Sequence, residues 1–418
     1  MTASNTAASG PGRREFVLLM AALMASNALA IDVMLPALPA IGEALRVVEA
    51  NDRQFVITSY LLGFGAAQLF YGPLADRFGR KKLLIGSMLA YALFATLAGL
   101  AASFSLMLAA RFAQGMAAAG TRVLIVAVVR DRYEGAAMAQ IMSLVMIVFM
   151  IVPVLAPSVG QLILAFGNWR ELFILIALYG LLLAVWGGLR IPETLHEEDR
   201  MTLSAGAVGN AIATTLTTRA SIGNTLASTL AFGGLFAFIG SVQQIVGDVF
   251  GRPGLIGIAF ACIAGPMAIS SYLNSRLVMG LGARRLLLLA LLALTGMALL
   301  HLAVALSWGE TIWTFVVLQA LTMACFGLVG ANAGSLAMAP VGHIAGTASS
   351  VQGLVTTIGG ALIGMTVGQA FDGTTLPLII GFTICGALAT LAALWANPRL
   401  IETLEGEESE GASPSPST

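Results

Sequence analysis

Apolar stretches of about 20 residues recur along the whole chain, and they restrict its fold more than any other feature of the sequence. A helix of that length crosses the hydrocarbon core of a bilayer. The chain is 58% hydrophobic and 10% charged, whereas soluble proteins carry about 25% charged residues. The sequence therefore predicts an all-α integral membrane protein with twelve transmembrane helices. The predicted spans are 16–38, 54–71, 83–102, 105–128, 138–165, 171–190, 223–246, 255–275, 285–307, 311–335, 345–370 and 376–396.

The chain divides near its middle, where the longest polar interruption separates six predicted spans from the next six. Every third span is rich in Leu and Ala and poor in polar residues, which indicates a three-helix unit used four times. Such repeats place a transport site between two halves, near the bilayer midplane. The predicted parts are an N-terminal segment 1–15, a six-helix bundle 16–190, a linker loop 191–222, a second six-helix bundle 223–396 and a disordered tail 397–418.

Basic residues predict the orientation, because cytoplasmic loops carry an excess of Lys and Arg. With the N-terminus inside, fifteen of the 21 basic residues fall on the inner side, four fall outside and two lie within spans. We expect both termini to be cytoplasmic. Ala28-Leu29-Ala30 resembles a signal-peptidase site, but the apolar run continues past it, which favours a retained span. The formal net charge of zero gives no reason to expect a nucleic-acid partner.

One acidic residue, Asp32, lies deep inside a predicted span. A carboxylate in hydrocarbon costs at least about 2.5 kcal/mol, so such a residue faces a bundle interior or a wet cavity and marks a functional site. Asp32 is therefore the first candidate for a group that binds protons or cargo.

The loop after the second span reads Gly72-Pro-Leu-Ala-Asp76-Arg77-Phe-Gly79-Arg80-Lys-Lys. Topology explains its basic residues but not the spacing of its glycines and Asp76. This string resembles the signature of the major facilitator superfamily. The resemblance implies a major facilitator fold, in which Gly72, Asp76, Arg77, Gly79 and Arg80 take part in gating.

Further strings resemble the drug/proton antiporters of the bicyclomycin-resistance type within that superfamily. They include the run from Asp32 to Pro39 and the run from Arg111 to Gly115. The resemblance implies that Arg111 couples transport to protons. It also implies that Asp131 joins Asp76 and Arg80 in a cytoplasmic charge cluster that latches the outward-facing state.

The fifth span departs from the antiporter signature Gly-Pro-x-x-Gly-Gly, because it reads Ala156-Pro157-Ser-Val-Gly160-Gln161. Pro157 still bends the helix and small residues still permit close approach, so we expect a role in gating. The departure weakens the indication of antiport, although it leaves the fold unaffected.

Helix geometry links the buried charges. Asp32 and Arg111 each lie about 9 Å from the outer end of a span. The resemblance implies that these two helices are neighbours, so we predict a direct or water-bridged contact between the two side chains. A static structural ion pair is the alternative. Arg122 lies eleven residues after Arg111, hence on nearly the same helix face. Both guanidiniums require acidic or polar partners.

The sequence predicts a proton-driven exporter of hydrophobic or cationic drugs in the bacterial inner membrane, acting as a monomer and without a cofactor. Asp32 would bind protons and cargo in turn. An anionic metabolite held by Arg122 is the alternative cargo, and a membrane sensor or enzyme would require a domain or reactive cluster that the sequence does not show. The candidate cargo-binding residues are Asp32, Arg122, Gln114, Tyr60, Phe64, Phe232, Phe236, Met323 and Phe326.

Overall fold

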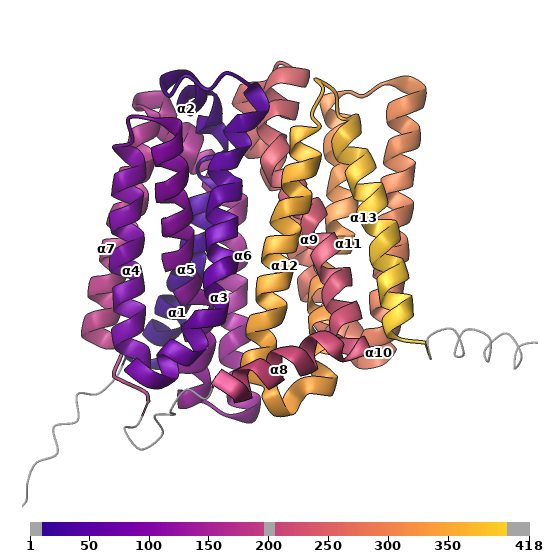
Figure 1. Ribbon diagram of the computed structural model, residues 1–418. Coiled ribbons are helices and arrows are strands. Elements are labelled where there is room, and N and C mark those ends of the chain that lie inside the picture. Colours follow the sequence, from indigo (N-terminus) through magenta and orange to yellow (C-terminus); the bar gives the residue numbers. More distant parts are fainter. Residues whose placement is uncertain (1–10, 196–204, 399–418) are drawn as a thin grey trace, which may run out of the picture.

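The computed structural model describes residues 11–195 and 205–398, and these residues form helices and no strands (Figure 1). The first half comprises α1 (Arg13–Asp32), η1 (Leu35–Ala37), α2 (Leu38–Ala44), η2 (Ala50–Gln54), α3 (Phe55–Phe78), α4 (Arg80–Gly99), α5 (Phe104–Arg132), α6 (Gly135–Phe166) and α7 (Trp169–Arg190). After these come α8 (Ala205–Thr217), α9 (Arg219–Gln244), η4 (Ile245–Val249), η5 (Pro253–Leu255), α10 (Ile256–Trp308), α11 (Ile312–Met338), η6 (Ala339–Ile344), α12 (Ala345–Gln369) and α13 (Leu376–Ala396).

Ten helical stretches among the described residues are long and apolar enough to cross a bilayer. Two of them, Pro253–Trp308 and Ile312–Gln369, contain 56 and 58 residues, about twice the length that one crossing needs. The first reverses at Gly282, whose φ of 74° is outside the helical region, and the second reverses at η6. Each therefore crosses twice, and the predicted fold of twelve membrane helices is confirmed.

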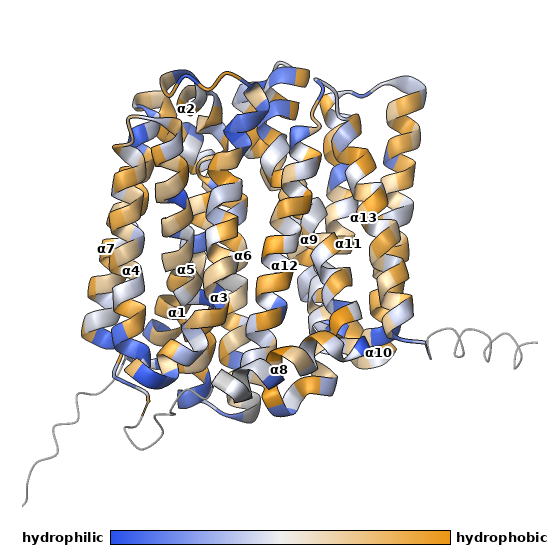
Figure 2. Ribbon diagram, in the orientation of Figure 1, coloured by the Kyte–Doolittle hydropathy of each residue, from blue (hydrophilic) through white to orange (hydrophobic). Residues whose placement is uncertain are grey.

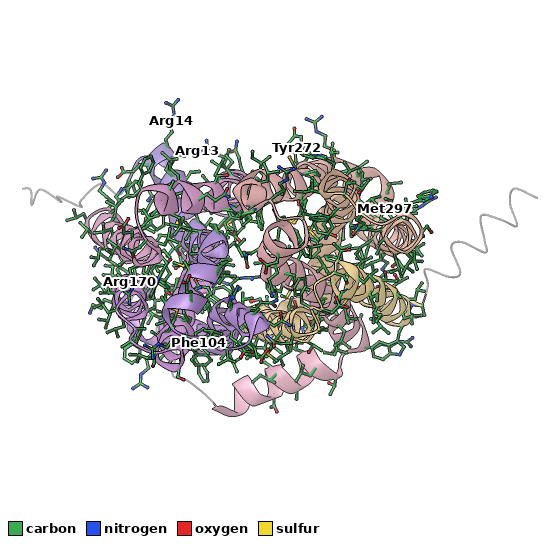
Figure 3. The ribbon with its side chains drawn as sticks, turned by 90° about the horizontal axis from the view of Figure 1, so that it is seen from above. Arg13, Arg14, Phe104, Arg170, Tyr272 and Met297 are labelled. Atoms are coloured by element: carbon green, nitrogen blue, oxygen red, sulfur yellow. The ribbon has the colours of Figure 1, made fainter. Side chains whose placement is uncertain are left out.

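The two six-helix halves lie side by side when the bundle is viewed along its axis (Figure 3), with Arg13, Arg14 and Arg170 on one half and Tyr272 and Met297 on the other. The halves contact each other through α3 with α12 and through α6 with α10. Hydrophobic residues cover the bodies of the helices, and hydrophilic residues gather toward the two ends of the bundle (Figure 2).

The predicted linker loop 191–222 contains a helix, α8, that lies across one end of the bundle (Figure 1). Ala211 and Thr215 are one turn apart and both are buried, because α8 packs against α9 and α12. The second bundle begins at Arg219, four residues earlier than predicted. The disordered tail was predicted over residues that lie, from 399 onward, outside the described part of the chain.

The first span is broken at Asp32, where α1 ends and a short turn leads into η1 and α2. Pro36 is the reason: its ring excludes the carbonyl of the residue four positions earlier, and it has no N–H to continue the helix. The break leaves carbonyl groups at the end of α1 without partners in their own helix. Asp32 is therefore at an irregular point within the membrane span.

Candidate transport site

A cavity of about 650 Å³ lies between the two halves, toward the end of the bundle that carries α8. Residues of α3, α5, α8, η6 and α12 line it, together with Arg80 at the start of α4. Its charged lining consists of Asp76, Arg80, Arg122 and Arg130, with His343 at the same end. Its apolar lining includes Leu69, Val123, Val126 and Ile344. The cavity has the volume of sites that hold drug-sized molecules.

The opposite end of the bundle is closed by hydrogen bonds between side-chain amides of the two halves. Gln54 donates to the side chain of Gln244 at 2.5 Å and to the carbonyl of Gly368 at 3.2 Å. Gln244 in turn donates to Asn51 at 2.8 Å, and Asn51 donates to the carbonyl of Gln369 at 3.1 Å. We call these five residues the amide clasp. They join η2 of one half to α9 and α12 of the other.

A second connection of the same kind joins α6 to α10. The Gln161 side chain donates to the carbonyl of Pro253 at 2.8 Å and accepts from the N–H of Gly257 at 2.9 Å. Gln161 is the residue that departs from the antiporter signature. Its amide therefore caps the first turn of α10 across the interface between the halves, a role that the expected glycine could not have.

Asp32 is buried, with 4% of its surface exposed, and it is not part of the cavity lining. Its Oδ1 atom has no hydrogen-bond partner in the described residues. Helix α6 approaches closely here, since a Cβ at Gly160 would overlap the carbonyl of Val33. Pro157 lies one turn earlier in α6. An ionised carboxylate without a partner is strongly disfavoured in an apolar interior, whereas a protonated one avoids that cost.

Arg111 makes no direct bond to Asp32 among the described residues, so the direct form of the predicted contact is wrong in this conformation. The fully buried guanidinium donates instead to the carbonyls of Ala30 (3.0 Å) and Val56 (3.1 Å) and to the side chain of Gln114 (2.8 Å). The physical reason is the break in the first span, which leaves the Ala30 carbonyl free to accept near the end of α1. Arg111 thereby ties α1 and α3 to α5.

A short polar chain extends from Arg111 into the first half. The guanidinium carbon lies 4.6 Å from the centre of the Tyr60 ring. The Tyr60 hydroxyl donates to Asn27 at 3.0 Å, and Asn27 donates to Thr121 at 2.8 Å. Asn27 was not among the predicted site residues, although it is a polar residue in the same apolar run as Asp32. Its place within a predicted span is the sequence feature that could have identified it.

Arg122 lies next to Thr121 but has a different environment from Arg111. Its side chain is exposed and lines the cavity, although it is about 15 Å from the end of α5 at 1.5 Å per residue. Among the described residues it has no ion pair or hydrogen bond. Polar partners were predicted for both arginines, and among the described residues only Arg111 has them.

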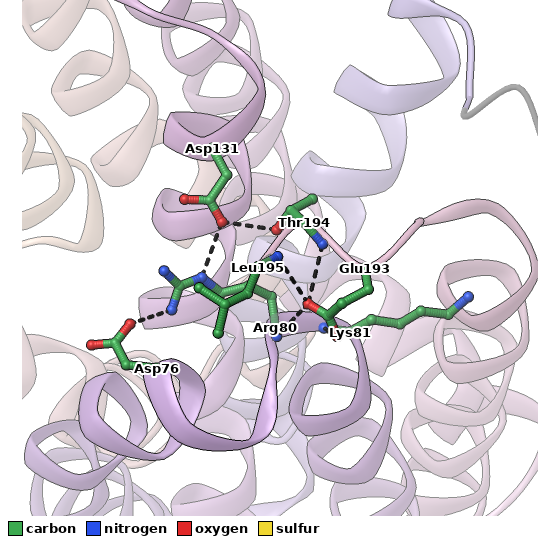
Figure 4. Close-up of polar contacts among 7 residues, drawn as sticks. All are labelled: Asp76, Arg80, Lys81, Asp131, Glu193, Thr194 and Leu195. Carbon is green, nitrogen blue, oxygen red and sulfur yellow. Dashed lines mark hydrogen bonds and ion pairs between the residues drawn. The ribbon is translucent and has the colours of Figure 1, made fainter. Parts of the chain in front are cut away.

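The predicted charge cluster is assembled at the α8 end of the first half (Figure 4). Arg80 contacts Asp76 at 2.5 Å and Asp131 at 3.0 Å. Gly79 has a φ of 93°, a conformation that favours glycine, and it allows α3 to turn directly into α4. Arg77 lies over the ring of its neighbour Phe78, while Gly72 lines the cavity.

Sequence reasoning missed a third acid in this cluster, beside Asp76 and Asp131. Glu193, which follows α7, accepts from the N–H groups of Arg80 at 2.8 Å and Lys81 at 3.2 Å (Figure 4). It therefore caps the N-terminus of α4, where a negative charge is favourable. Thr194 donates to Asp131 at 2.8 Å. No motif marks Glu193, because its partners are backbone atoms.

The predicted aromatic residues pack within the bundle and are not part of the cavity lining. Phe232 contacts both Phe236 and Phe326, with ring centres 5.8 and 5.2 Å apart. Tyr60 and Phe64 are stacked in the other half at 6.4 Å. Met323 is also buried. The described residues contain no group of three or more metal-ligating side chains.

Comparison with known proteins agrees with this architecture. Residues 20–205 match the family model of the Major Facilitator Superfamily. The chain is 30% identical over 391 residues to a bicyclomycin resistance protein homolog of Haemophilus influenzae, covering 93% of this chain and 97% of that protein. It is 30% identical over 381 residues to the multidrug resistance protein MdtL of Salmonella typhimurium, covering 90% and 94%.

Among solved structures, the fold is similar to that of the human organic anion transporter MFSD10, with a TM-score of 0.66 and 18% identity. The alignment covers 92% of this chain and all of that one. At this identity the similarity concerns the fold alone. The similarity to the Haemophilus protein extends over nearly the whole length of both chains, and the chain belongs to the major facilitator superfamily of membrane transporters.

Proposed function

We propose that this protein is a proton-coupled exporter of hydrophobic, drug-like molecules in the bacterial inner membrane, with both termini in the cytoplasm. The names of its bacterial relatives, a bicyclomycin resistance protein homolog and a multidrug resistance protein, support drug-like cargo. The observation that carries proton coupling is the buried Oδ1 of Asp32, which has no partner in the described residues.

The proposed cycle alternates between two states of the interface. In the state described here, the cavity faces the cytoplasm and admits cargo, while the amide clasp and Gln161 keep the outer end closed. Proton and cargo are bound at separate places, because Asp32 is outside the cavity lining. Each ligand favours the state that binds it more strongly. Arg111 links the two places, since it joins the end of α1 to α3 and α5.

We assign gating to two regions. The cluster of Asp76, Arg80 and Asp131, with the tight turn at Gly79, would close the cytoplasmic side when the cavity closes. Pro157 permits α6 to bend beside the end of α1. The predicted aromatic pocket would contact cargo only after the halves have moved, because its rings are outside the lining in this state.

Transport by Asp32→Asn protein in liposomes tests the proton-carrier role. Asn has the same shape but cannot exchange a proton, so we expect the variant to fold and to exchange cargo across the membrane without a gradient. Uphill export driven by a pH difference should be lost. Export by the variant at the wild-type rate, against a cargo gradient, would show that Asp32 is not the proton carrier.

One observation favours a second cargo class. The cavity presents three arginines and one carboxylate, and that carboxylate is paired with Arg80. Such a lining does not favour the cationic drugs that the sequence suggested. It favours the anionic cargo that was the alternative prediction.

A further inference from the structure

The central cavity holds a positive charge that the protein does not neutralise. Arg80 is bound by two carboxylates, Asp76 and Asp131. Arg122 lines the same cavity and has neither an ion pair nor a hydrogen bond among the described residues. A cationic group in a membrane protein normally pairs with an acid or with backbone carbonyls. Arg122 is therefore available to a ligand.

Topology does not explain this charge. Basic residues that determine orientation lie in loops and at the ends of spans, as Arg130 does at the end of α5. Arg122 is about ten residues from the end of that helix, or about 15 Å into the bundle. A guanidinium at that depth indicates a role in binding cargo rather than in setting the orientation of the protein in the membrane.

The other residues that line the cavity indicate the polarity and size of the part of the ligand that does not contact Arg122. Leu69, Val123 and Val126 supply apolar surface around Arg122, and Ser350 approaches from the other half. Gln68 closes the deep side, because its amide donates to Thr357 across the interface at 3.0 Å. The cavity volume of about 650 Å³ suits one compact molecule.

We infer that the cargo is a small amphipathic organic anion whose carboxylate or sulfonate group binds Arg122 while its apolar body contacts α3 and α5. Guanidinium forms paired, charge-assisted hydrogen bonds with such groups. This inference rests on the proposed transport function and specifies its substrate class. It also makes Arg122 the residue that distinguishes anionic from neutral cargo.

Equilibrium binding to the full-length protein in phosphatidylcholine nanodiscs tests the inference. Three fluorescent probes share one apolar body: dansylglycine is an anion, dansylglycine amide is neutral and dansylcadaverine is a cation. A hydrogen bond to a charged group contributes about 1.5–3 kcal/mol. We therefore expect the anion to bind at least about tenfold more tightly than the amide, and the cation to bind most weakly.

Variants locate the effect. Arg122→Gln should bring the affinity for the anion down to that for the amide while leaving the amide unchanged. Arg122→Lys should retain part of the preference. Arg276→Gln is the matched control, because it removes an exposed charge outside the cavity lining and should change nothing. Equal weakening of all three probes by Arg122→Gln, or a wild-type preference for the cation, would overturn the inference.

A lipid headgroup is the other source of an anionic group. Repeating the titration in nanodiscs that contain phosphatidylglycerol distinguishes the two. We expect the same affinity for dansylglycine, and a marked loss would identify lipid as the occupant of the cavity and overturn the inference. These binding measurements use no proton gradient. A negative result would therefore reject anionic cargo without rejecting proton-driven export, which the Asp32→Asn transport assay tests separately.

Discussion

Arg111 is a buried cation whose direct partners among the described residues are two backbone carbonyls and the Gln114 side chain, with no carboxylate. Its bonds to Ala30 and Val56 hold the broken end of α1 against α3. Lysine cannot reproduce the fork of donors that reaches both carbonyls. We expect Arg111→Lys to lower the free energy of unfolding by about 1–3 kcal/mol for each carbonyl left unpaired, measured by SDS titration of the purified protein.

The same measurement distinguishes this arrangement from an ion pair. If Arg111 and Asp32 do not touch, the effects of Arg111→Lys and Asp32→Asn on the unfolding free energy should add to within about 0.5 kcal/mol. Arg276→Lys is the control for loss of a guanidinium on the surface. A coupling energy clearly above that limit would mean that the two side chains interact after all.

Sequence reasoning found the buried charges because a charge in an apolar run is conspicuous. It found Asp32 and Arg111 and the cluster around Arg80, but it did not find the direct partners of Arg111. The correct partners are a carbonyl freed by Pro36 and another at the start of α3. Carbonyl groups are identical at every position of a sequence, so only coordinates show which of them are left without partners.

At the scale of helices, the amide clasp closes the end opposite α8 with bonds between side-chain amides and backbone carbonyls. Gln54 is its centre, because it is bonded to both Gln244 and Gly368. These bonds join neutral groups, and each contributes about 1 kcal/mol. They therefore stabilise the closed conformation only modestly, so that it can still open. Gln54→Ala should therefore shift the population toward opening of this end.

Spin labels placed on Glu49 and Asp248, exposed residues of the two halves near the clasp, would report that shift. In a background without the native cysteines, Gln54→Ala should add a longer component to the distance distribution. Thr366→Ala is the matched control, since the Thr366 hydroxyl bonds only within α12. An unchanged distribution in the Gln54 variant would remove the clasp from the gating scheme.

The twelve spans were predictable because hydropathy and length decide them. Helix α8 and the clasp were not predictable. Helix α8 is only 13 residues long and depends on a surface provided by α9 and α12. The residues of the clasp are separated by up to 318 positions, so the pairing of Asn51 with Gln369 follows from how two bundles meet and not from any local pattern.

At the scale of the whole molecule, transport requires the two halves to separate where they now touch. Ser158 of α6 and Gly257 of α10 meet toward the end opposite α8, where a Cβ on Gly257 would lie 3.0 Å from the Ser158 Cα atom. Cysteines at such positions are close enough to form a disulfide.

In a protein lacking Cys262, Cys325 and Cys385, oxidation of the Ser158→Cys/Gly257→Cys pair should stop transport in liposomes. It should leave binding of dansylglycine intact, because the cavity lies toward the opposite end. A reductant should restore transport, and each single variant should be insensitive to oxidant. Continued transport by the fully cross-linked protein would mean that the two halves do not separate at this end. The alternating motion of two rigid halves would then have to be replaced by a local gate.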